Sequence, residues 1–92
     1  MAALSFSKVS GKYVAEFTAN GNFALHIERA GAGVITMEQT SVQGSQYAPV
    51  MGFSQNWRNF PVIDTTITGD VFPMYIKIVS ETQPSMAVVT EA

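Results

Sequence analysis

The sequence predicts a small all-β protein, either an antiparallel sandwich or a closed barrel. Apolar and polar residues alternate in several segments, short glycine-containing turns separate them, and no segment shows a sustained 3.6-residue apolar period. Three of the turns are Ser10-Gly11, Asn20-Gly21 and Gly69-Asp70. We expect one domain, residues 1–92, with the modest core that a chain of this length can bury.

The first two strands flank Ser10-Gly11, because polarity alternates over residues 3–9 and 12–18. If Ser10-Gly11 is a two-residue loop, Leu4 lies opposite Phe17 and the apolar faces of both strands coincide. This agreement supports a hairpin in that register.

The third strand, residues 23–28, tests the loop length at Asn20-Gly21. A two-residue loop would place apolar residues opposite polar ones, as any one-residue slip does. A three-residue loop, with Gly21 in the left-handed conformation of a G1 bulge, instead pairs Phe17 with Phe23. We therefore expect the bulged hairpin.

A fourth strand over about residues 34–40 follows the glycine-rich turn at 31–33, and a three-residue loop there brings Ile27 opposite Met37. The first 40 residues thus predict a four-stranded antiparallel meander with one apolar face. The residues of that face are Leu4, Phe6, Tyr13, Phe17, Phe23, Leu25, Ile27, Ile35 and Met37.

The C-terminal part predicts a second, smaller sheet. Residues 61–68 and 71–79 form a hairpin around Gly69-Asp70, whose leading glycine suits a type II′ turn, and a terminal strand spans residues 86–90. The meander and this second sheet each have an apolar side. Burying these sides against each other gives the sandwich or the barrel.

Composition restricts the possible partners. Only 13% of the residues are charged, against about 25% in a typical soluble domain. Low charge is typical of interface cores, and equally of a β domain with a Ser/Thr-rich exterior. The net charge of -2, with five scattered basic residues, argues against nucleic acid. No run is long enough for a signal peptide or a membrane span, so we expect a cytoplasmic or virion-associated protein with no membrane partner.

Catalytic residues are not expected. The only histidine, His26, lies beside Glu28 on the polar side of its strand, about 7 Å away along the backbone. Such a pair can perform acid–base chemistry, but it is more commonly a solvated pair. In the expected register Glu16 or Val14 lies near His26, and Glu16 would raise its pKa without any function. With no cysteine, nucleophile elbow, metal-ligand spacing or phosphate loop, the sequence predicts a non-enzyme without cofactor or metal.

Binding residues are expected in residues 41–60, a long connection without clear period that contains the only tryptophan. Long loops on rigid scaffolds commonly carry binding, and Trp, Tyr and Arg dominate interface hot spots. The predicted partner-binding residues are Tyr47, Met51, Trp57, Arg58 and Asn59. Phe53 and Phe60 are expected to plug an open end of the sandwich, and the sequence leaves Trp57 open between core and surface.

Two functions remain. The first is a non-enzymatic structural or assembly protein that packs into a larger homo- or hetero-complex, with residues 61–68 and 86–90 as candidate edge strands. In composition the chain resembles small virion components of bacteriophages, such as capsid decoration or head–tail accessory proteins, although no motif carries this likeness. The second is a carbohydrate- or peptide-binding module in which Trp57 and Tyr47 hold the ligand.

Overall fold

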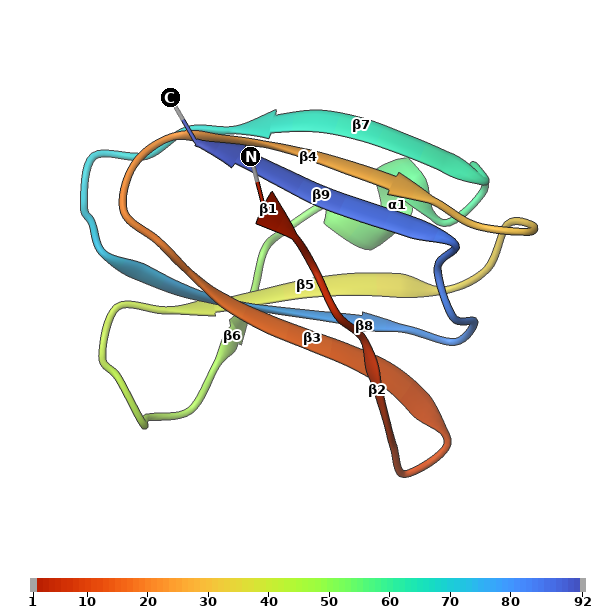
Figure 1. The fold of residues 1–92 in the computed structure, drawn as a ribbon. Coiled ribbons are helices and arrows are strands. Elements are labelled where there is room, and N and C mark those ends of the chain that lie inside the picture. Colours follow the sequence, from red (N-terminus) through yellow and green to blue (C-terminus); the bar gives the residue numbers. More distant parts are fainter. Residues whose placement is uncertain (1, 92) are drawn as a thin grey trace.

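A computed structural model describes residues 2–91 and shows two antiparallel sheets packed face to face (Figure 1). Sheet A has the order β1-β9-β4-β7 and sheet B the order β2-β3-β8-β5-β6. The strands of sheet A are β1 (Ala2–Ala3), β9 (Met86–Glu91), β4 (Phe23–Glu28) and β7 (Val62–Ile67). Those of sheet B are β2 (Ser7–Val9), β3 (Lys12–Ala19), β8 (Met74–Ser80), β5 (Ile35–Thr40) and β6 (Ala48–Pro49). The all-β class is confirmed, as an open sandwich and not a closed barrel.

The four-stranded meander is wrong, because β3, β4 and β5 alternate between the two sheets. Phe17 and Phe23 do meet, but across the sandwich: their rings lie edge to face, with centroids 5.3 Å apart and planes at 89°. Gly21 is not left-handed, so the expected G1 bulge is absent at this position. An apolar face specifies what a strand buries. It does not specify whether the facing strand lies beside it or in the opposite sheet.

The second expected hairpin fails for the same reason. β7 belongs to sheet A and β8 to sheet B, so the chain around Gly69-Asp70 crosses between sheets. β8 pairs instead with β3 and β5, and β7 pairs with β4. The terminal strand β9 forms as expected, but it lies between β1 and β4 and is therefore not an edge.

The hairpin at Ser10-Gly11 is confirmed, with Ser7 opposite Val14 as predicted. Both loop residues have positive φ, 51° and 81°, as a type I′ turn requires. The strand before this turn, β2, begins only at Ser7 and not at residue 3 as expected. Residues 4–6 cross to the other sheet, where the Leu4 amide donates to the carbonyl oxygen of Ala87 at 2.8 Å (Figure 1). Leu4 is consequently not paired with Phe17.

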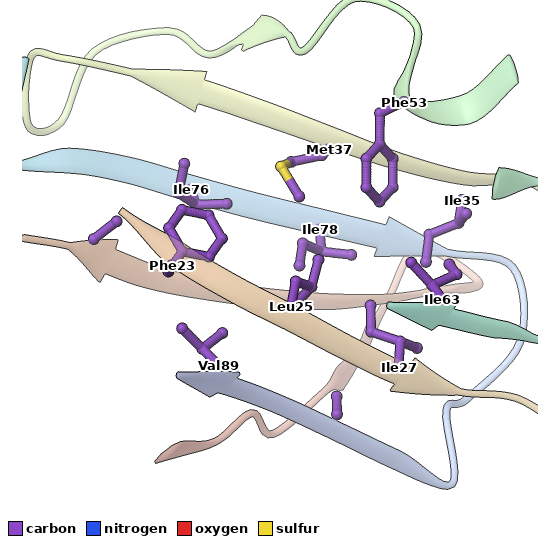
Figure 2. Packing of buried hydrophobic residues seen from close by; sticks show 12 residues of the cluster. Phe23, Leu25, Ile27, Ile35, Met37, Phe53, Ile63, Ile76, Ile78 and Val89 are labelled. Carbon is purple, nitrogen blue, oxygen red and sulfur yellow. The ribbon is translucent and has the colours of Figure 1, made fainter. Parts of the chain in front are cut away.

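The core lies between the two sheets and is formed by residues of β3, β4, β5, β7, β8, β9 and the residue Phe53 (Figure 2). Of the expected apolar face, Phe23, Leu25, Ile27, Ile35 and Met37 are buried, and Leu4, Phe6 and Phe17 are partly buried against them. Tyr13 is half-buried beside the Lys8 ammonium. The C-terminal strands add Ile63, Ile76, Ile78 and Val89.

One short helix, α1 (Phe53–Trp57), corrects the expectation that the chain contains no helix. Its five residues are too few to produce a recognisable apolar period. Phe53 is buried in the core, so its predicted plugging role is confirmed. Phe60 is 51% exposed, so the same expectation for Phe60 is wrong.

The two turn glycines differ in backbone conformation, and this gives a stability prediction. Gly11→Ala should lower the free energy of unfolding by about 1 kcal/mol, because a side chain at φ +81° is strained. Gly21→Ala is the matched control and should cost nothing, because Gly21 lacks a positive φ and an added Cβ meets nothing within 4 Å. Urea denaturation measures both. If Gly21→Ala lowers the free energy of unfolding more than Gly11→Ala does, the result would instead support a left-handed Gly21 in a bulged hairpin.

Candidate functional site

The five predicted site residues do not form one cluster. Tyr47 lies on the outer face of sheet B, where its hydroxyl donates to Oε1 of Glu16 at 3.1 Å. The Lys77 ammonium lies 4.5 Å from the centroid of the Tyr47 ring. Burial and the hydrogen bond to Glu16 raise the pKa of Tyr47. These contacts tie Tyr47 to its own sheet.

Trp57 has different surroundings. It is the last residue of α1, it is half-buried against the core, and its ring meets that of Phe60 edge to face, with centroids 5.9 Å apart. The sequence left open whether Trp57 lies in the core or on the surface, and the structure places it between the two. Because Tyr47 and Trp57 contact different partners, the structure does not assemble them into a joint aromatic platform.

The other predicted residues are exposed at the two ends of α1. Met51, which precedes the helix, is 86% exposed, and the exposed residues Arg58 and Asn59 follow the helix. Two further exposed apolar side chains lie nearby and were not among the predicted binding residues: Phe60 and, at 49% exposure, Val62. Val62 begins β7, so this exposed stretch leads directly into a strand.

A buried arginine fixes this stretch in place. Arg29 is only 5% exposed, and burial lowers the pKa of its guanidinium. Nη1 donates to the carbonyl oxygen of Gly33 at 2.7 Å, and Nη2 donates to those of Trp57, at 3.2 Å, and Phe60. One side chain thereby joins the end of α1 to the β4–β5 connection.

Two backbone hydrogen bonds reinforce the same junction. The Arg29 amide donates to the carbonyl oxygen of Pro61, and the Gly33 amide donates to that of Arg58, each at 2.9 Å. The sequence contains one signal for this role of Arg29. It continues the inward-facing positions of β4 two residues after Ile27, where an apolar residue is expected.

The only histidine lies between two carboxylates on the outer face of sheet A. Nε2 of His26 is 2.8 Å from Oε2 of Glu28, and Nδ1 is 3.0 Å from Oδ2 of Asp64, which is the cross-strand partner of His26. The hydrogen bond to Glu28, followed by that to Asp64, raises the pKa of His26. The expectation that Glu16 or Val14 lies near His26 is wrong, because β3 lies in the other sheet.

Hollows in the surface lie elsewhere. An open hollow of about 570 Å³ is lined by residues 3–6 and 83–88. A second, of about 300 Å³, lies under the loop 68–73 and is lined largely by apolar side chains such as Ile67 and Phe72. His26 lines neither. Within residues 2–91, no cluster of three or more His, Cys, Asp or Glu side chains is arranged to hold a metal ion.

The helix content of the described chain is limited to α1, and no helix there is long and apolar enough to cross a membrane. Comparisons with protein-family models, with curated proteins and with solved structures find no match for this chain.

The Arg29 junction can be tested by truncating its head group. Arg29→Met keeps the apolar stem but leaves three carbonyl oxygens without their donor, so the free energy of unfolding should fall by about 2–4 kcal/mol. Arg58→Met, at an exposed position, is the control and should change it by less than about 0.5 kcal/mol. Chemical denaturation followed by Trp57 fluorescence measures both, and equal effects would contradict the assigned role.

The His26 cluster predicts a defined pH dependence. Because the pKa of His26 is raised in the folded state, its stabilisation is complete below the unfolded value of about 6.5 and is lost as pH rises through the folded pKa. The wild-type protein should therefore have a higher free energy of unfolding than His26→Gln, and this difference should be larger at pH 6 than at pH 8.5. NMR titration should give a midpoint that falls in Glu28→Gln. An unchanged midpoint would show that Glu28 does not hold the imidazolium.

Proposed function

We propose that this chain is a non-enzymatic assembly protein that docks onto a protein partner through residues 57–67, here called the docking surface. The observation that carries the proposal is the continuity of this surface. Exposed Phe60 and Val62 lead directly into β7, which is hydrogen-bonded to β4 and ends the order of sheet A. An apolar contact and a row of backbone donors and acceptors are thus presented side by side.

The docking surface is also held in shape before any partner binds. The Arg29 guanidinium donates to two carbonyl oxygens in its first half, those of Trp57 and Phe60, and β4 pairs with its second half. A surface that is already ordered loses less conformational entropy on association. This rigidity favours docking over a flexible linker role.

The chemistry of the docking surface suits a protein partner. Arg58 and Asp64 are its only charged residues, and it contains the single tryptophan. Interface cores are depleted of charge and enriched in aromatic residues and arginine. Nucleic acid and membrane partners would instead call for a basic patch or an extended apolar one. The likeness in composition to capsid decoration and head–tail accessory proteins fits a unit that packs into a larger oligomer such as a virion. No observation favours the carbohydrate- or peptide-binding alternative.

Light scattering after size-exclusion chromatography, across a tenfold dilution, tests the proposal. The wild-type mass should exceed the monomer mass of 9.9 kDa at the upper concentration and fall on dilution. Phe60→Ser should weaken association by about tenfold, the loss typical of an aromatic interface residue. Val42→Ser is the matched control: Val42 is 61% exposed but lies in the turn after β5, so its variant should associate like wild type.

One result would contradict the proposal, and a second would restrict it to a different partner protein. If Phe60→Ser and Val42→Ser associate equally well, the docking surface is not the contact. If the wild-type protein stays monomeric at every concentration, self-assembly is excluded, and only docking onto a different protein remains.

A further inference from the structure

The edges of the two sheets differ in how they are protected. Three of the four edge strands are short: β1 and β6 have two residues each, and β2 has three. β6 also contains Pro49, which lacks an amide donor. β3 extends beyond β2, and the part beyond β2 lies near the crossing segment, where Leu4 and Phe17 line a common hollow. Short strands, proline and covering segments are the usual devices that prevent edge-to-edge pairing.

β7 has none of these devices. It is six residues long, and Val62–Ile67 contains no proline, glycine or lysine. Its single charge, on Asp64, is held on the outer face by His26 of the neighbouring strand. Within residues 2–91 no strand pairs with its second edge, which is therefore free to pair with another extended strand.

The sequence of β7 is complementary to itself when reversed. In an antiparallel pair, residues directly opposite each other point to the same side of the sheet. When two copies of β7 pair about a two-fold axis, one residue of β7 must therefore lie opposite its own copy, with the axis between them. An axis at Thr65 places Ile63 opposite Ile67 on the inner face. An axis at Asp64 would instead place two carboxylates directly opposite each other, which is unfavourable. The first register is the one that chemistry favours.

The same register sets Asp64 of one copy opposite Thr66 of the second copy. Phe60 precedes the start of β7, and the apolar hollow of about 300 Å³, with Ile67 and Phe72 in its lining, lies at the end of β7. Antiparallel pairing brings these two opposite ends of the strand together, once on each side of the axis.

We propose that two copies of this chain associate by antiparallel pairing of β7 with β7 about a two-fold axis at Thr65. The four strands of each sheet A then continue into one eight-stranded sheet. This inference rests on the proposed assembly function and names the partner as a second copy. It is an isologous contact, so it closes at the dimer and does not propagate.

Charge substitutions at Thr66 test the pairing. Thr66→Asp places a carboxylate opposite Asp64 of the second copy, twice per dimer, and should weaken dimerisation about tenfold. Thr66→Lys places an ammonium there and should tighten it by about threefold. Thr90 provides matched controls, because Thr66 and Thr90 flank Ala24 on opposite sides and both are exposed. Thr90→Asp and Thr90→Lys should dimerise like wild type.

Dissociation constants come from light scattering over a dilution series, with thermal melts to show that every variant folds. Amide hydrogen exchange gives a second readout, since β7 amides should gain protection as concentration rises. A wild-type protein that is monomeric throughout overturns this inference but leaves docking onto another protein. An oligomer that responds to Phe60→Ser but not to the sign of the charge at Thr66 overturns the β7 pairing alone.

Discussion

A buried guanidinium holds one flank of this sandwich together. Two stacked sheets leave an open side wherever their edge strands diverge, and here α1 packs on β5 on the flank where β7 is the edge strand (Figure 1). A five-residue helix has little intrinsic stability, and its final carbonyl groups have no partners within the helix. Arg29 supplies donors to the carbonyl oxygens of Trp57 and Phe60 from the end of β4. The position of the docking surface therefore depends on one side chain of the core strand behind it.

The two flanks are closed by different means, and this decides what remains accessible. On one flank the N-terminal segment passes from sheet A to sheet B and places Leu4 and Phe6 against the core. On the other flank α1 packs on β5 and places Phe53 in the core, while the outer edge of β7 stays without a strand partner in the described chain. Covering that edge is what an assembly partner would add.

On both outer faces one basic side chain lies between two carboxylates. On sheet B, Lys77 lies directly between Glu16 and Glu38 in the register of three strands. On sheet A, His26 lies between Glu28 and Asp64. Each basic side chain reduces the repulsion between its two carboxylates, and the charge that remains is screened by salt beyond about one Debye length. A sparsely charged docking surface can then be brought against a protein partner at little electrostatic cost.

The sequence by itself determined the strands, the face that each one buries and the turn at Ser10-Gly11, because a period of two and a type I′ turn are local properties. Phe23, Leu25 and Ile27 were identified as core from alternation alone, and residues 41–60 were identified as a connection without a clear period that contains the only tryptophan. The assignment of strands to sheets came only from the tertiary structure. A contact such as Phe17 with Phe23 satisfies the same pattern within one sheet or between two. The junction at Arg29 and the pairing of His26 with Asp64, 38 residues away, were likewise beyond local pattern, because both depend on which distant strands become neighbours.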